Sequence, residues 1–124
     1  MSIDSVVHIF TPSRYKVNKK YIAAFAENIL ASFHISKSNS INIVFVGKRK
    51  MKQIAKTYKQ ENVALPVLAF PYKQGEQADG ERIIGEVVIC YPQAILLAAE
   101  RTKTVDTMMK QLIEHGIRNI FRYS

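Results

Sequence analysis

The stretch INIVFV, residues 41–46, is apolar at every position except Asn42. A nearly continuous apolar run of this length predicts a strand that is buried on both faces, in the middle of a sheet. Two other apolar segments, one on each side of it in the sequence, also predict strands: residues 6–10, and IIGEVVIC at 83–90. The stretch at 41–46 is therefore the expected centre of the fold.

A fourth strand is predicted for LPVLAFP, residues 65–71, which is bounded by Pro66 and Pro71. Proline has no backbone N–H to give to a sheet, so this strand is expected at an edge. An edge strand of this kind favours a mixed sheet over a purely parallel one. The following segment, residues 73–82, contains glycines and charges and is predicted to be a mobile loop.

Segments with helical periodicity alternate with these strands. Asn18 can cap a helix in which apolar residues recur at three- and four-residue spacing. A basic helix is predicted for residues 48–60, with an apolar stripe formed by Met51, Ile54, Ala55 and Tyr58. A helix with proline in its first turn is predicted for residues 92–101. Thr104 can cap the last helix.

These elements predict an α+β fold in which a mixed sheet of about four strands is packed with helices. A chain of 124 residues is long enough for one core and too short for two ordinary domains. A single domain over residues 1–124 is therefore expected.

Composition narrows the class of protein. A hydrophobic content of 48% with 23% charged residues is typical of a soluble globular chain. Apolar runs stay shorter than the ~20 residues that a membrane-spanning helix needs, and Asp4 stands where a secretion signal would be basic. Cys90 is the single cysteine, which fits a reducing compartment, and it is interpreted as a packing residue. A cytoplasmic location without a membrane partner is expected.

The net charge of +8 arises from 18 Lys and Arg against 10 Asp and Glu. Such an excess favours an anionic partner, of which RNA and DNA are the commonest. In the basic helix, four lysines fall on one face: Lys48, Lys52, Lys56 and Lys59. This face is predicted to contact RNA phosphates. A solvated surface that aids only solubility is the alternative, and the sequence leaves both open.

The stretch HGIRNIFRYS, residues 115–124, has part of a metal-binding pattern. His115 and Asn119 are four apart, so they share one face of a helix. A catalytic zinc needs three protein ligands, and the oxygen of an amide is a weak ligand for zinc. His8 and His34 have no ligand set near them in the sequence. The alternative is that His115 is a satisfied core residue beside the apolar stripe of its helix.

Three stretches, taken in order, resemble one known family. They are YK with LPVLAFP between residues 58 and 71, IGEVVIC at 84–90, and HGIRNIFRY at 115–123. Together they resemble the YbeY family of bacterial rRNA-maturation factors, which are described as zinc-dependent endoribonucleases. The resemblance implies the zincin-like YbeY fold. It also implies RNA as partner, either ribosomal RNA or the small ribosomal subunit.

The family's functional positions carry over in part. His115 matches the first histidine of the family's metal motif, Asn119 stands at the second, and Ser124 stands just before the third. The terminal carboxylate at Ser124 is a possible oxygen donor. Lys59 stands at the family's arginine position. It keeps the positive charge but lacks the planar guanidinium group, which can bind a phosphate with two hydrogen bonds. Glu86 stands at the acidic residue of the family's G-D strand.

Two functions follow from this comparison. The first is an rRNA-maturation factor that resembles the YbeY endoribonucleases and has a degenerate zinc site. The second is a non-catalytic assembly factor that binds RNA or the ribosome. Zinc is expected only if the family site survives in altered form, no other cofactor is expected, and whether the chain is an enzyme stays open. A zinc protease is disfavoured because the H-E-x-x-H pattern is absent from the sequence.

Overall fold

The structure is a computed structural model that describes residues 7–35, 39–59, 65–78 and 81–122, with backbone alone for 73–78 and 81. Within these ranges the elements run β1 (Val7–Phe10), α1 (Lys19–Ser32), β2 (Asn39–Val46), α2 (Lys48–Tyr58), β3 (Val67–Ala78), β4 (Glu81–Cys90), α3 (Tyr91–Glu100) and α4 (Val105–Arg122). The predicted strands and helices are all present.

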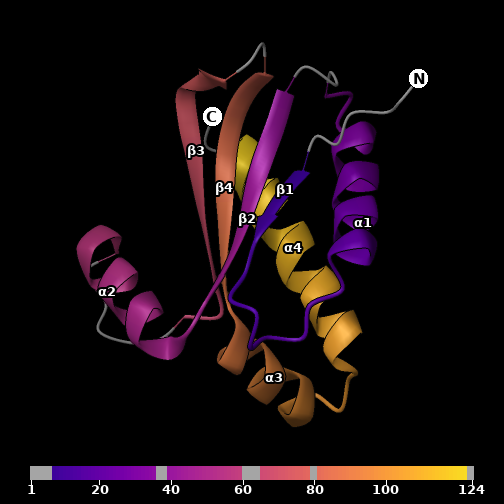
Figure 1. Ribbon diagram of the computed structural model, residues 1–124, viewed down its shortest axis with the longest axis vertical. Coiled ribbons are helices and arrows are strands. Elements are labelled where there is room, and N and C mark those ends of the chain that lie inside the picture. Colours follow the sequence, from indigo (N-terminus) through magenta and orange to yellow (C-terminus); the bar gives the residue numbers. More distant parts are fainter. Residues whose placement is uncertain (1–6, 36–38, 60–64, 79–80, 123–124) are drawn as a thin grey trace.

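The sheet is four-stranded and mixed, with the order β1-β2-β4-β3. β1, β2 and β4 are parallel, and β3 pairs antiparallel with β4 at the edge. The strand of residues 41–46 therefore lies inside the sheet, and the proline-bounded strand lies at the edge, as predicted. In Figure 1, α4 passes behind the sheet and α1 lies to its right, whereas α2 projects at the lower left beside β3.

The prediction of a mobile loop for residues 73–82 is wrong where the structure describes this segment. β3 continues to Ala78, and Gln77 pairs with Arg82 of β4. A register shift separates this part of the ladder from the part that ends at Pro71. The backbone supplies the hydrogen bonds of an edge ladder, so a polar segment can form a strand without an apolar face. Residues 79 and 80 lie outside the described residues.

The main core fills the sheet face covered by α1, α3 and α4. Its central members from the sheet are Ile41, Ile43, Phe45, Val87 and Ile89. α1 begins where predicted, since the Asn18 side chain accepts a hydrogen bond from the Tyr21 backbone N–H at 3.1 Å. α4 begins similarly, with the Thr107 N–H donating to the Thr104 hydroxyl at 3.1 Å.

A smaller core fills the opposite face of the sheet, under α2. It contains Val46, Met51, Ala55, Leu68, Val88 and Cys90. Successive residues of β4 alternate between the two cores because side chains of a strand point to opposite faces. α2 and α4 therefore pack on opposite faces of the sheet. Among the described residues, no helix is both long enough and apolar enough to cross a membrane.

Candidate functional site

Two glycines set the distance between α4 and β4. A Cβ on Gly85 of β4 would lie 2.9 Å from Cδ1 of Ile120 on α4, and Gly116 of α4 leaves similar room for Val87 of β4. No side chain fits at either position without a shift of its neighbours. This close approach fixes the distance between α4 and the sheet and the rotation of α4 about its own axis. It leaves His115, next to Gly116, on the exposed side of the helix, so the alternative of a core histidine is wrong.

The structure brings His115 and Asn119 together, as their spacing of four residues predicts. The amide nitrogen of Asn119 lies 3.1 Å from Nε2 of His115. An amide nitrogen is a donor, so in this arrangement the ring nitrogen accepts and its lone pair is occupied. A zinc ion would need that same lone pair. In this arrangement Asn119 thus satisfies His115 with a hydrogen bond and provides no ligand beside it.

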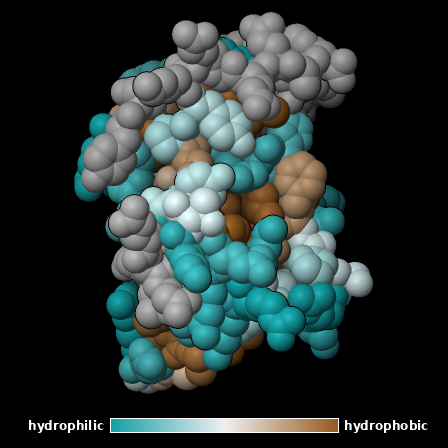
Figure 2. All heavy atoms as spheres, turned by 90° about the vertical axis from the view of Figure 1, so that its left-hand side faces the viewer, coloured by the Kyte–Doolittle hydropathy of each residue, from teal (hydrophilic) through white to brown (hydrophobic). Residues whose placement is uncertain are grey.

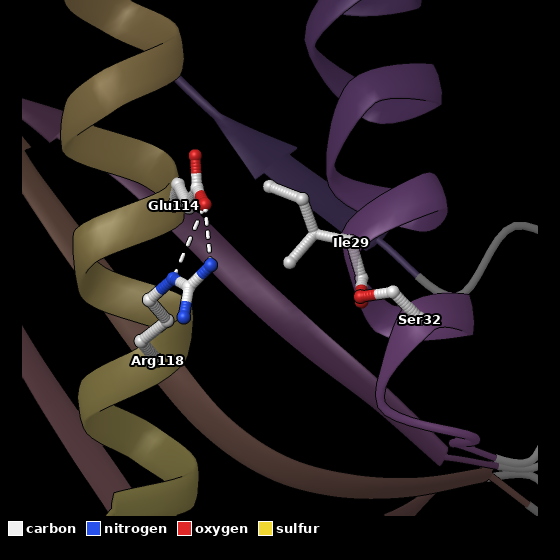
Figure 3. A network of polar contacts seen from close by, with 4 residues as sticks. All are labelled: Ile29, Ser32, Glu114 and Arg118. Carbon is white, nitrogen blue, oxygen red and sulfur yellow. Dashed lines mark hydrogen bonds and ion pairs between the residues drawn. The ribbon is translucent and has the colours of Figure 1, made fainter.

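The neighbouring carboxylate on α4 is also engaged elsewhere. Glu114 accepts two hydrogen bonds from Arg118, at 3.1 Å from Nε and 2.8 Å from Nη2. Figure 3 shows this pair on the side of α4 that faces α1, where Ser32 bonds back to the Ile29 carbonyl. One residue further along a helix turns a side chain by about 100°. Glu114 therefore points away from His115 and forms an ion pair with Arg118.

The described residues do not fit a catalytic zinc centre. They contain no group of three or more His, Cys, Asp or Glu side chains that could hold a metal. His115 supplies one imidazole and Asn119 one amide, which is one good ligand where three are needed. His8 lies in β1, and His34 follows α1, so neither joins His115. Ser124 lies outside the described residues.

The predicted basic face is on α2. Lys48, Lys52 and Lys56 are all exposed, while Met51 and Ala55 of the same helix are buried. Lys59 is exposed too, but it follows the last turn of α2 as its C-cap residue. α2 begins after Gly47, which provides no side-chain cap. The four lysines thus form a basic surface on the face of the sheet opposite to α4.

A groove that sequence reasoning missed runs along the other flank of α2. Its floor and walls come from α2, β3 and β4: Lys50, Gln53, Ile54, Thr57, Tyr58, Phe70, Pro71, Tyr72, Glu86 and Val88. At about 100° per residue, Lys52 and Lys56 point away from this flank. None of the four predicted lysines lines the groove. Figure 2, which faces this side of the molecule, shows apolar surface in a hollow among hydrophilic side chains.

Aromatic rings form one wall of the groove. Tyr58 was predicted to lie in the apolar stripe of its helix, but 68% of its surface is exposed. Its ring lies edge-on to Phe70 of β3, with centroids 5.1 Å apart. Tyr72 lies two residues further along β3, so it shares the face of Phe70. The sequence signal for this wall was the FPY stretch at residues 70–72, whose rings alternate at strand spacing.

Among the side chains that the structure describes, Glu86 is the only acidic one that lines the groove. It lies opposite Phe70 in the strand register, and it is partly buried. Burial raises the pKa of its carboxyl above the usual range for glutamate. Within the part of the chain that the structure describes, no hydrogen bond or ion pair reaches its carboxylate. Glu86 is therefore a desolvated acceptor without a protein partner there.

A basic hollow adjoins the groove at the start of α2. It is lined by Arg14, Tyr15, Gly47, Lys48, Arg49, Lys50, Gln53 and Pro92. The Arg14 guanidinium lies 4.8 Å from the centroid of the Tyr15 ring, and that ring stacks on Tyr91 at 4.5 Å. Lys50 and Gln53 line both the hollow and the groove, so the two are continuous along α2.

Comparison with known proteins agrees with this fold and with the order of the motifs. Residues 9–123 match the family described as Endoribonuclease YbeY. The chain belongs to that family. The predicted YbeY resemblance is thereby confirmed, together with the α+β fold and its mixed sheet of four strands.

Several curated YbeY proteins are similar to the chain. "Endoribonuclease YbeY" of Aquifex aeolicus is 30% identical over 108 residues, which are 87% of this chain and 70% of that protein. "Endoribonuclease YbeY" of Thermodesulfovibrio yellowstonii is 30% identical over 83 residues. Those residues are 67% of this chain and 52% of the Thermodesulfovibrio protein, so the chain spans about half the length of that relative.

A solved structure supports the YbeY fold. The solution structure of TM1509 from Thermotoga maritima superposes with a TM-score of 0.64 at 18% identity. The match covers 92% of this chain and 71% of TM1509. At this level of identity the likeness concerns the fold alone. The overall fold is therefore shared.

Proposed function

We propose that this YbeY-family protein is an rRNA-maturation factor that binds RNA through the basic surface of α2. The observation that carries the proposal is the row of exposed lysines along α2 and at its C-cap: Lys48, Lys52, Lys56 and Lys59. The net charge of +8 supports a polyanionic partner. Ribosomal RNA, alone or in the small subunit, is the proposed partner, and the cytoplasm is the proposed place of action.

The binding chemistry is electrostatic. Each lysine that meets a phosphate releases a condensed counterion, and this release drives association with a polyanion. Lys59 stands at the family's arginine, at the end of α2. An ammonium group holds a phosphate as a point charge, whereas arginine would add two directed hydrogen bonds. The surface is therefore suited to hold RNA with little selection among phosphate positions.

The zinc site of this chain is proposed to be degenerate. Zinc would supply a bound hydroxide for phosphodiester hydrolysis in a complete site. The residues that the structure describes offer His115 as one imidazole, with its Nε2 satisfied by Asn119 at 3.1 Å. Binding and orientation of RNA are the roles that the chain's own residues support.

A non-catalytic assembly factor is the second candidate. The contact between Asn119 and His115 favours it, because it gives the histidine a structural partner in place of a metal. In this version the protein holds RNA or a ribosomal surface in place during assembly and breaks no bond. Both candidates share the basic surface of α2 and differ only in cleavage.

One experiment separates the two candidates and tests the proposal as a whole. The purified protein is titrated with an end-labelled fragment of small-subunit rRNA, and both binding and cleavage are followed with and without added zinc. Salt-dependent binding is expected. Cleavage that persists in the His115→Ala variant would mark an altered active site, and binding without cleavage would mark an assembly factor. Absence of any RNA binding at low salt would refute the proposal.

A further inference from the structure

The groove between α2 and the β3–β4 edge combines three kinds of chemistry. Aromatic rings form one wall, with Tyr58 exposed and Phe70 beneath it. Val88 of β4 gives an apolar lining, and Glu86 beside it provides a carboxylate. Lys50 brings one positive charge. A ligand that fits must be flat and apolar on its faces and must carry hydrogen-bond donors on its edge.

We propose that this groove binds one unstacked guanine base of the RNA, with Tyr58 as the stacking surface and Glu86 as the acceptor for the base edge. The inference rests on the proposed RNA-binding function and adds a base preference to it. Aromatic side chains commonly stack on the bases of single-stranded RNA, whose edges are then free for hydrogen bonds. The exposed ring of Tyr58 suits that role.

The charges favour a base over a phosphate in the groove. A phosphate would meet the Glu86 carboxylate, and two negative charges in a partly desolvated groove repel each other. The adjoining hollow has the opposite character, with Arg14, Lys48 and Arg49 in its lining. Because Lys50 and Gln53 line both recesses, an RNA strand can place phosphates in the hollow and a neighbouring base in the groove.

The acceptor selects among the bases. Guanine presents two adjacent donors, N1–H and N2–H, which match the two oxygens of one carboxylate. Adenine and cytosine present one amino group beside a ring nitrogen that repels a carboxylate, and uracil presents one N–H between two carbonyls. Two hydrogen bonds to an ionised acceptor are stronger than one. They would also replace the hydration that the Glu86 carboxylate loses on burial.

A protein partner is the competing occupant, since an arginine side chain also offers two donors to a carboxylate. The surroundings disfavour it. Lys50 lines the same groove, and Arg49 and Lys48 line the adjoining hollow, so a cationic side chain would approach through a field of like charge. An arginine-containing peptide is therefore an informative competitor in the test.

The test uses the full chain and a set of short oligouridine RNAs that differ at one central position, which is G, A, C or U. Dissociation constants are measured by fluorescence anisotropy at fixed salt. The oligomer with a central G is expected to bind about tenfold more tightly than oligouridine, the low end for a good bidentate contact. The Glu86→Gln variant should lose this ratio and bind the four oligomers with similar affinities. Glu100→Gln, at an exposed carboxylate on α3, is the matched control and should keep the ratio.

A second variant and three possible results complete the test. Tyr58→Ala should weaken binding of all four oligomers. Because the Tyr58 side chain is largely exposed, the variant should keep its fold, which a thermal melt checks. Equal affinities for G, A, C and U would overturn the base preference while the RNA-binding function stands. No affinity for any oligomer would overturn the function itself. Binding of an arginine-containing peptide that Glu86→Gln abolishes would assign the groove to a protein partner and overturn the inference.

Discussion

Gly116 of α4 packs directly against Val87 of β4, and a Cβ added to Gly116 would lie 2.6 Å from Cγ1 of Val87. Val87 is fully buried, and its branched side chain has little freedom to move aside. The helix that carries His115 therefore rests on the sheet with no space for a side chain at this point. The glycine of the HGIRN stretch is explained by packing, independently of any metal.

Gly116→Ala is expected to destabilise the protein. Alanine favours a helix over glycine by about 1 kcal/mol, whereas overpacking of a rigid core costs about 1–3 kcal/mol. Because Val87 cannot yield, the second effect should win, and the free energy of unfolding should fall by up to roughly 2 kcal/mol in urea denaturation. Adding Val87→Ala should cost less in the Gly116→Ala background than in the natural chain. A Gly116→Ala variant more stable than the natural chain would contradict the packing argument.

Zinc binding is predicted to be weak in the natural chain and to be improved by a second histidine. Asn119→His places two imidazoles four residues apart on one exposed face, a spacing that suits a shared metal. Competition against a chromophoric chelator should show tighter zinc binding by this variant. Combining Asn119→His with His115→Ala should remove the gain. Near-equimolar zinc in the natural protein, lost on His115→Ala, would mean that the site is intact.

The basic surface of α2 is predicted to make phosphate contacts. The Lys52→Glu/Lys56→Glu variant should bind RNA more weakly. The slope of log affinity against log salt should become shallower by about 1.4, since each lost contact to a single strand removes about 0.7. Arg101→Glu/Lys103→Glu changes the net charge equally at exposed positions beyond α3 and is the control. If both variants behave alike, the lysines act only through total charge.

The stability of the protein is predicted to depend on the ionisation of Glu86. Burial raises its pKa in the folded state, so the folded state binds the proton more tightly than the unfolded state. The free energy of unfolding should therefore fall as pH rises from the ordinary glutamate pKa, near ~4.3, through the raised value. Glu86→Gln should be more stable than the natural chain at neutral pH, and the difference should vanish in acid. Denaturant titrations across this range would refute the idea if the difference were constant.

The local pattern of residues was sufficient for most of the elements. The run at residues 41–46 predicted an internal strand, and β2 lies between β1 and β4. Asn18 and Thr104 were identified as caps because a side-chain oxygen at a helix start can accept a hydrogen bond from a free backbone N–H of the first turn. Both residues accept such a bond in the structure. The spacing of His115 and Asn119 predicted that they share one face of α4, where the structure places them in contact. These features depend on neighbours within one turn or one strand.

Other features depended on partners distant in the sequence. The polar segment after Pro71 was assigned to a loop, yet its backbone pairs with β4. An Asp79-Gly80 dipeptide, a sequence typical of hairpins, was the signal for that pairing. Tyr58 fell on the apolar stripe by spacing, but α2 reaches past the edge of the smaller core there, so the ring stays exposed.

The groove is the feature that the local sequence pattern predicted least. Periodicity identified which residues of α2 face the core, but not which strand lies beside each flank of the helix. The register that sets Phe70 opposite Glu86 joins segments on two strands, and the packing of α2 brings Tyr58 to them. The side-chain periods of helices and strands follow from backbone geometry, so they can be recognised directly in the sequence. The meeting of an aromatic wall with a desolvated carboxylate arises from the packing of distant segments, whose long-range contacts no local period encodes.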